Sequence, residues 1–265
     1  MRTASLLALT LGLGTAAYAQ LQNNQNKDMK CDDHRSGRNR ESFCEMREIP
    51  GMAAGSLAVD AGQNGGVTVK GWLRNEVLVR ARVSAEARTV GEAQSAVGQV
   101  HVVVNSGRVS ADGPPMNRED NWSVSFEIFV PQRTNVNLTA HNGGLHVSDL
   151  NGDIQFQTTN GGVHLSRLAG RVHGSTVNGG VHMEMEGNRW DGSEVDVRTT
   201  NGGVHMKMPN NYSAHVEAST VNGRVHAGAE NLRNDKENRM YSANLGRGGA
   251  MIRAATTNGS VHIGN

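Results

Sequence analysis

Six histidines recur at one position of a short repeat, and they are the residues of this chain best suited to chemistry. Each closes the string Asn-Gly-x-x-His, and they are His146, His164, His182, His205, His226 and His262. Imidazole is a ligand for Zn, Cu and Ni, and its charge changes near neutral pH. A column of imidazoles therefore predicts weak metal binding, a pH-dependent surface or an anion-binding stripe.

A solvent-exposed strand position also explains these histidines without any ligand. A straight column presents neighbouring rings from one direction, whereas a closed zinc site needs ligands that converge tetrahedrally. Met183 and Met206 directly follow His182 and His205, but strand alternation turns them inward as core residues. We therefore expect no cofactor, apart from weak binding of Zn or Ni by the histidine column.

The histidines belong to a nine-residue repeat that runs from Arg133 to the C-terminus. Its fourth position is always aliphatic: Val136, Leu145, Ile154, Val163, Val172, Val181, Val195, Val204, Val216, Val225, Ile252 and Val261. Its sixth position is mostly apolar: Leu138, Val147, Phe156, Leu165, Met183, Val197, Met206 and Ile263. A polar residue lies between them, and this alternation predicts a strand with one buried face. Because so short a repeat cannot bury that face alone, the copies must stack.

The Asn-Gly pair is expected to turn the chain between strands, because Gly accepts positive φ and Asn tolerates it. Successive strings start at Asn142, Asn160 and Asn178, so two nine-residue arms form one coil of eighteen residues. Coils about 4.8 Å apart would stack the Asn side chains into a hydrogen-bonded column. Corner acids are missing apart from Asp153, which argues against a calcium-binding roll.

Residues 1–19 are predicted to be a secretory signal peptide. Arg2 precedes the apolar run Ser5–Gly14, which is too short to span a bilayer, and Ala17–Ala19 is a small-x-small cleavage site. We therefore expect an exported protein of the periplasm, cell surface or medium, without membrane insertion after cleavage. Without Arg2 the 26 basic residues become 25, which match the 25 acids, and this neutrality argues against nucleic acid as a partner.

Three further segments are predicted after the signal peptide: a polar leader over 20–47, an N-terminal β region over 48–132 and the repeats over 133–265. Cys31 and Cys44 in the leader are expected to pair, since export favours a disulfide over metal-ligating thiolates. Thr89 and Glu92 have capping-box spacing, which predicts one short helix over 90–99. Strands are expected at His101–Asn105, Arg108–Ala111, Trp122–Val130 and, within the last insertion, Tyr241–Leu245. The predicted fold is an all-β β-solenoid with an N-terminal cap that contains this helix.

Several strings resemble a known family of exported bacterial β-strand-repeat domains of unknown function, the "putative adhesin" family. The corner strings are Thr159–Val163 (TNGGV), Thr200–Val204 (TNGGV) and Thr257–Val261 (TNGSV). The upstream strings are 43–48 (FCEMRE), 64–66 (NGG), 108–113 (RVSADG), 122–125 (WSVS) and 189–192 (RWDG). The resemblance implies a β-solenoid outside the cytoplasm and brings no catalytic residues.

Three functions follow as hypotheses. The first is a non-catalytic, adhesin-like or structural module that binds an envelope or cell-surface partner, with Trp190 and Tyr212 as the best exposed aromatic side chains for sugar stacking. The second is a metal- or pH-responsive surface built on the histidine column. The third is a polysaccharide-acting enzyme, which needs paired carboxylates. Asp191, Glu194 and Asp196 come closest to such a cluster, but a solvated strand face explains them equally well, so we expect no enzyme.

Overall fold

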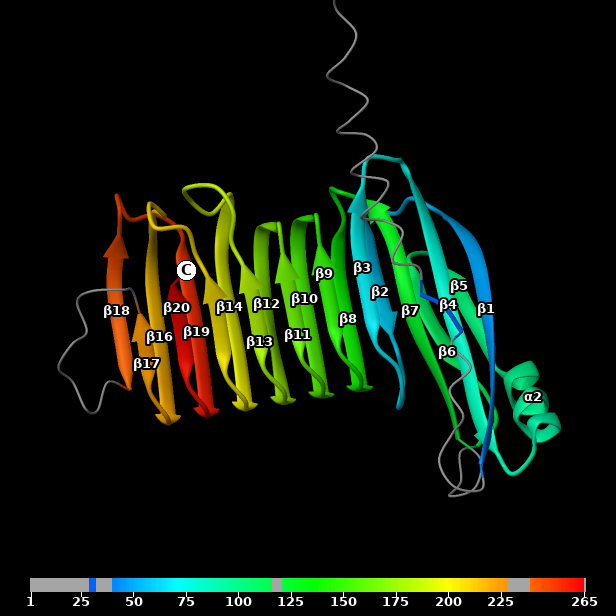
Figure 1. Cartoon of the computed structure of the whole chain (residues 1–265). Helices are drawn as coiled ribbons and strands as arrows, with labels where there is room; N and C mark the ends of the chain where they lie inside the picture. The colour runs from blue at the N-terminus through cyan, green and yellow to red at the C-terminus, as the bar shows by residue number, and fades with distance from the viewer. Residues whose placement is uncertain (1–28, 32–39, 116–120, 228–238, 265) are drawn as a thin grey trace, which may run out of the picture. The chain divides into compact units, whose positions relative to one another are not determined.

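The computed structural model describes residues 29–31, 40–115, 121–227 and 239–264 (Figure 1). The chain divides into two compact units, Met1–Lys30 and Cys31–Asn265. Every described strand and the described helix belong to the second unit. The predicted signal peptide and much of the predicted leader lie outside the described residues. No helix in the described ranges is long and apolar enough to cross a membrane.

The second unit contains two ten-stranded mixed sheets and, among the described residues, one helix, so the predicted all-β class is confirmed. Sheet A has the strand order β1 (Glu41–Met52), β4 (Glu76–Ala87), β7 (Asn121–Pro131), β3 (Val67–Trp72), β9 (Leu145–Ser148), β11 (Val163–Ser166), β13 (Val181–Glu184), β15 (Val204–Lys207), β20 (Val261–Gly264) and β17 (Val225–Ala227). Sheet B has the order β18 (Met240–Leu245), β16 (Ala214–Asn222), β19 (Met251–Asn258), β14 (Gly192–Asn201), β12 (Ala169–Asn178), β10 (Asn151–Asn160), β8 (Asn135–Asn142), β2 (Ser56–Asp60), β6 (Arg108–Asp112) and β5 (His101–Asn105).

Each coil of the repeat contributes one long strand to sheet B and one short strand to sheet A. The coils are β8–β9, β10–β11, β12–β13, β14–β15, β16–β17 and β19–β20. Equivalent strands pair in parallel without a change of register at the motif, so Asn160 lies opposite Asn142 and Asn178. All the fourth- and sixth-position side chains of the repeat are buried, as predicted, in one cluster shared by both sheets.

The coils are not stacked in chain order. The β19–β20 coil lies between β14–β15 and β16–β17, with β19 hydrogen-bonded to both β14 and β16 (Figure 1). The predicted extra strand is present as β18, and it pairs antiparallel with the far side of β16. The residues Gly246–Ala250 therefore carry the chain from β18 across the start of β16 to β19.

The predicted helix is confirmed as α2 (Val90–Gln99), and Thr89 and Glu92 form the predicted capping box. It packs against β1 and β4, and Arg47 of β1 donates hydrogen bonds to the carbonyls of Val97 and Val100 at its C-terminus. The predicted strands of the N-terminal region are present as β5, β6 and β7. Strand β1 begins at Glu41, inside the segment predicted to be a leader.

The reason given above for the corner glycines is wrong for most of them. Among the glycines that follow a corner Asn, only Gly65 and Gly259 have positive φ. The others are required by close stacking: a Cβ on Gly161 would overlap the carbonyl oxygen of Gly143 in the preceding coil. Positive φ occurs instead at the opposite corner, at Asp149 and Arg167.

Candidate functional site: a histidine ladder

The six motif histidines come together as one column of stacked rings on the outer face of sheet A, which we call the histidine ladder. Its spatial order is His146, His164, His182, His205, His262 and His226. Neighbouring ring centroids lie 4.5 to 5.0 Å apart, and their planes differ by 2 to 15°. Strand β20 lies between β15 and β17, so its His262 stacks between His205 and His226.

A second glycine lies beside the ring in four of the six motifs, at Gly144, Gly162, Gly180 and Gly203, whereas Arg224 and Ser260 occupy that position before His226 and His262. Residues two apart on a strand share a face, and the ring of His205 leans back over Gly203. A Cβ on Gly203 would lie 3.2 Å from His205 Nε2, and the corresponding distance at Gly180 to His182 Nε2 is 3.4 Å. The glycines therefore leave a flat strip of backbone beside the ladder.

Stacking opposes protonation of the ladder. Burial and the neighbouring His182 lower the pKa of His205, in that order, and burial followed by His226 and His205 lowers the pKa of His262. At the other end, burial, His164 and Lys70 lower the pKa of His146. A positive charge on one ring thus disfavours a positive charge on the next.

Charged residues continue the ladder's row toward the N-terminal strands. Thr68 lies opposite His146, and Glu127 lies opposite Thr68. Glu127 is 3% exposed, and its carboxylate lies 2.7 Å from Lys70 Nζ and 3.6 Å from Arg80 Nη1. The row therefore changes from ion pairs to imidazoles at Thr68.

A polar spine runs along the corner next to the ladder. The predicted Asn column is confirmed: each amide Nδ2 donates to the Oδ1 of the preceding coil, and the column runs Asn121, Asn64, Asn142, Asn160, Asn178, Asn201, Asn258 and Asn222. Sequence reasoning missed a second column of buried threonines, whose hydroxyls donate to corner glycine carbonyls: Thr158, Thr176, Thr199, Thr220 and Thr256. The recurrence of threonine at position eight of alternate units could have predicted this column.

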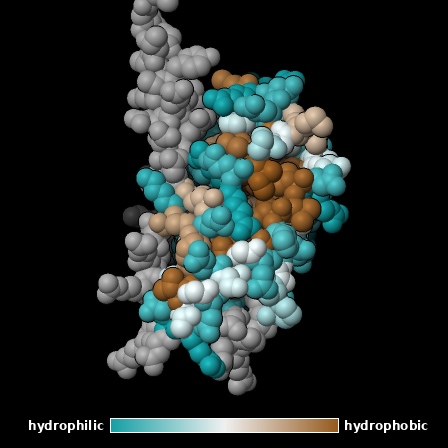
Figure 2. Space-filling view, turned by 90° about the vertical axis from the view of Figure 1, so that its right-hand side faces the viewer, coloured by the Kyte–Doolittle hydropathy of each residue, from teal (hydrophilic) through white to brown (hydrophobic). Residues whose placement is uncertain are grey.

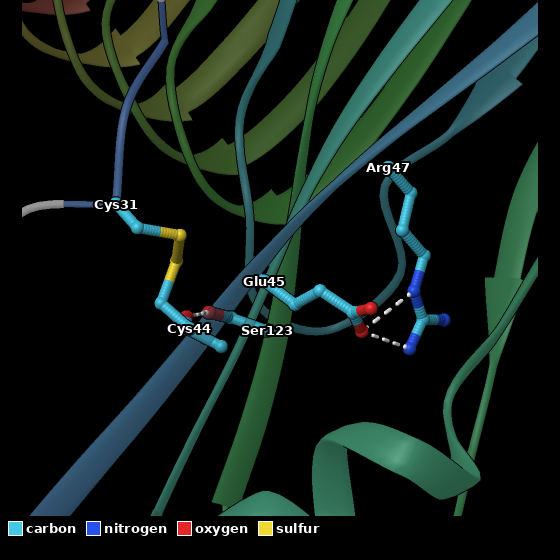
Figure 3. Close-up of a disulfide and its surroundings, with 6 residues drawn as sticks. Cys31, Cys44, Glu45, Arg47 and Ser123 are labelled. Atoms are coloured by element: carbon cyan, nitrogen blue, oxygen red, sulfur yellow. Dashed lines mark hydrogen bonds and ion pairs between the residues drawn. A yellow bond between two sulfur atoms is a disulfide. The ribbon is translucent and has the colours of Figure 1, made fainter.

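The ladder offers no closed metal site. Within the described ranges, no group of three or more His, Cys, Asp or Glu side chains is placed to hold a metal ion. Binding by adjacent imidazoles remains a prediction. The two cysteines form a disulfide, Cys31–Cys44, which ties the segment before β1 to β1 beside the Glu45–Arg47 ion pair (Figure 3). No free thiolate is left for a metal.

Several acids of the repeat region lie beside cations. Asp149 pairs with Arg167, Asp153 with Arg171 and Glu184 with Lys207. Asp196, one of the three acids singled out above, is nearly buried on sheet B beside Arg198 and Arg253. Burial raises the pKa of Asp196, but the hydrogen bond from Arg198 and the nearby charges of Arg198, His173 and Arg253 together outweigh it, so the pKa is lowered. This arrangement neutralises charge rather than pairing two carboxylates.

The prediction that Trp190 and Tyr212 are exposed sugar platforms is wrong. Trp190 is 6% exposed and Tyr212 is 2% exposed, because both fill the core where insertions lengthen a corner. The Trp190 Nε1–H donates to the Gly170 carbonyl, and burial raises the pKa of Tyr212 to about 12. No aromatic side chain in the described part of the chain is fully exposed.

The other end of sheets A and B carries a separate apolar hollow. It lies between the end of β1 and the turn that joins β5 to β6, and Met52, Leu57, Val77 and Val104 line it. Apolar surface is visible among polar residues on the end of the unit that bears β1 and α2 (Figure 2). Nothing in the structure indicates what would cover this hollow, so the histidine ladder is the stronger candidate site.

Comparison with known families decides the family. The family model described as Toastrack DUF4097 matches residues 48–264, most of the chain. The chain belongs to the Toastrack DUF4097 family. The resemblance drawn from the corner strings is thereby confirmed. Among curated proteins, no significant match is found for this Toastrack chain.

Solved structures similar to the Toastrack chain share little sequence with it. One is a "putative cell adhesion protein" from Clostridium sporogenes, 12% identical, with a TM-score of 0.46 over 84% of this chain and 99% of the other. Another is a "putative adhesin" from Bacteroides fragilis, 10% identical, with a TM-score of 0.35 over 83% and 97%. A third is a "putative adhesin" from Parabacteroides merdae, 9% identical, with a TM-score of 0.34 over 83% and 93%.

Proposed function

We propose that this protein is a non-catalytic, adhesin-like or structural binding module of the cell envelope, and that its binding face is the outer face of sheet A. The observation that carries the proposal is the histidine ladder itself. Its rings form a flat, exposed and regularly spaced array beside a strip of glycine backbone. Such an array suits an extended partner that runs along the coils, since it has no concave centre for a small substrate.

The architecture of the module follows from the same repeat. Residues 133–265 form a β-solenoid of two-strand coils, and residues 48–132 form its N-terminal cap. Support comes from the in-register parallel pairing of the coils and from their shared aliphatic core. A rigid rod of this kind holds side chains at fixed intervals of one strand spacing.

The module works outside the cytoplasm, in the periplasm or at the cell surface. Support comes from the signal-peptide features of residues 1–19 and from the Cys31–Cys44 disulfide, since disulfides persist in oxidising compartments. The partner is an envelope or surface component, and neither nucleic acid nor insertion into a membrane is part of this proposal.

Binding to isolated envelope polysaccharides and envelope protein fractions tests the proposed face. The purified protein is compared with the triple variant His164→Thr, His182→Thr, His205→Thr, in which Thr restores the residue type found at Thr68. A matched control changes exposed residues of sheet B, Asn137→Thr and Gln157→Thr. The expected result is retention by the parent and the control and loss by the triple variant. Equal retention of all three proteins would refute the face, and release of reducing sugar would refute the non-catalytic role.

A second function, a metal- or pH-responsive surface, is favoured by the lowered pKa values of His146, His205 and His262. Neutral rings are the form that binds metals, and the rings of the ladder are exposed on one face of sheet A. The expected affinity for Zn or Ni is weak and falls at acidic pH, because protons compete for the same nitrogens. Calorimetric titration of the parent and the triple variant at pH 7.5 and pH 5.5 measures it.

A further inference from the structure

The β19–β20 coil occupies a slot that two other coils of the chain define. On one side Gly202 N–H and Val204 N–H donate to the carbonyls of Asn258 and Ser260. On the other side Gly259 N–H and Val261 N–H donate to the carbonyls of Asn222 and Arg224. The two neighbouring coils, β14–β15 and β16–β17, are the walls of the slot, and the β19–β20 coil is the insert. Both walls therefore bind the insert in the same backbone register that joins the other coils. Within sheets A and B, β16–β17 reaches the rest of the repeat only through this insert.

Charge makes the slot specific for this insert. Asp196 of β14 and Glu217 of β16 stand on the two walls, and Arg253 of β19 lies between them. Arg253 Nη2 is 2.9 Å from Glu217 Oε2, and its Nη1 is 3.6 Å from Asp196 Oδ2. If the coils were stacked in chain order, Asp196 and Glu217 would face each other directly, and like charges at strand spacing repel. The interleaved order is the arrangement that the charges favour.

A glycine-rich crossing connects the insert to the rest of the chain. Gly246, Gly248 and Gly249 all have positive φ. Arg247 N–H donates to Ser213 Oγ at 3.3 Å, so the crossing passes close over Ser213. Leu245 and Met251 sit on opposite sides of β16, about 9.6 Å apart for two strand spacings. This crossing can act as a hinge, because glycine changes φ and ψ without steric cost.

We propose that the slot is a binding site for the β19–β20 segment of a second copy of this chain, so that two copies exchange C-terminal coils. In the exchanged dimer each slot keeps every contact of the monomer. Only the hinge changes, and exchange is therefore governed by hinge length and protein concentration. Since the insert carries His262, the partner's His262 completes the histidine ladder of each copy. Exchange thus joins two candidate binding faces without a gap in either ladder.

Pairs of full-chain variants, each with one cysteine added beside the native Cys31–Cys44 disulfide, test the exchange. Lys207 of β15 lies opposite Gly264 of β20, so one copy carries Lys207→Cys and the other Gly264→Cys. The copies are unfolded and refolded together without reductant, then treated with a short bismaleimide. The expected result is a cross-linked heterodimer whose fraction rises about tenfold for a tenfold rise in concentration while it is the minor species. A single chain carrying both cysteines, which should cross-link internally, is the control for proximity.

A Gly264→Cys copy that also carries Val261→Asp is the matched negative control. Val261 is fully buried, so this insert cannot enter any slot and should give no heterodimer. Absence of the heterodimer with the unmodified insert at every concentration would overturn the proposal.

A hinge variant gives an independent result. Deleting Arg247–Gly249 leaves two residues between Leu245 and Met251, a reach of about 10 Å, with Ser213 in the direct path. The expected outcome is a folded dimer by light scattering, and a folded monomer with an intact ladder would overturn the proposal. If this deletion prevents folding, the cross-linking of Lys207→Cys with Gly264→Cys alone decides whether the coils are exchanged.

Discussion

Acidification should weaken this protein through its histidine ladder. His146, His205 and His262 have lowered pKa values in the folded chain. The unfolded chain, with an ordinary His pKa near 6.5, therefore holds more protons as the pH falls below that value. Because protons then favour the unfolded state, stability is full above about pH 7 and falls through this range. The loss stops below the folded-state pKa values, where both states are protonated.

The size of the effect follows from the ring spacing. Two unit charges 5 Å apart in water repel by about 0.8 kcal/mol, and the ladder has five adjacent pairs. Full protonation would thus cost about 4 kcal/mol without salt. Physiological salt, with a Debye length of about 8 Å, reduces this to roughly 2 kcal/mol. We expect the free energy of unfolding to fall by about 2 kcal/mol between pH 7.5 and pH 5.

Urea unfolding at pH 7.5 and pH 5, at low and high salt, measures this loss. The variant His164→Thr, His182→Thr, His205→Thr retains one adjacent pair, His262 and His226, and should lose only about 0.4 kcal/mol through the ladder. His173 lies beside Asp196 and His215 lies beside Glu217, both outside the ladder. Both pairs are present in parent and variant, so the difference between the two proteins isolates the ladder.

The refuting outcome is specific. If the parent and the triple variant lose the same free energy between pH 7.5 and pH 5, and high salt does not reduce the loss in the parent, the rings do not interact through their charges. The ladder is then only a strand position where histidine is tolerated. Lys70, Glu184, Lys207 and Arg224 lie on the same face in both the parent and the triple variant, so they do not account for a difference between the two proteins.

Three other substitutions test the fold. Val204→Asp places an unpaired charge in the core and should cost more than about 3 kcal/mol, measured by circular dichroism and thermal unfolding. Gly161→Ala should cost several kcal/mol because its Cβ would meet the Gly143 carbonyl, whereas Gly162→Ala, whose Cβ meets only ordinary contacts at 3.7 and 3.9 Å, should change stability by less than about 1 kcal/mol; equal effects would contradict the close-stacking argument. Replacing Cys31 and Cys44 with Ser should leave the strand signal of the repeat intact, and loss of that signal would show that the disulfide supports more than β1.

The sequence was sufficient for the features that depend on local pattern. Alternation around Val163 and Val204 predicted the buried face, and the spacing of Thr89 and Glu92 predicted the helix, because each rests on residues a few positions apart. The recurrence of histidine at the same position of six units placed the rings on one face before their distances were known. The aliphatic positions and the histidines recur along the repeat, so a weak pattern in one copy is supported by the pattern in the others.

Coil order and corner filling could not be predicted in this way. Every coil pairs in the same register, so any stacking order satisfies the aliphatic pattern. Only the charges of Asp196, Arg253 and Glu217 distinguish one stacking order from another. Trp190 and Tyr212 were misplaced because they lie in insertions, where alternation gives no direction. The role of the corner glycines was misassigned since the sequence shows a glycine but not the carbonyl that approaches it.

The Asn-Gly column has a consequence for the chemical lifetime of the protein. Asn-Gly is the dipeptide most prone to deamidation, which begins when the glycine nitrogen attacks the side-chain amide carbon. Here Gly161 N–H is held by the Asn178 carbonyl, and the Asn160 amide is held in the column on both sides. The nucleophile and its target are thus fixed apart while the coils remain stacked. Peptide mapping after prolonged incubation should find these asparagines intact in folded protein and converted in urea, so that the stack preserves the residues from which it is built.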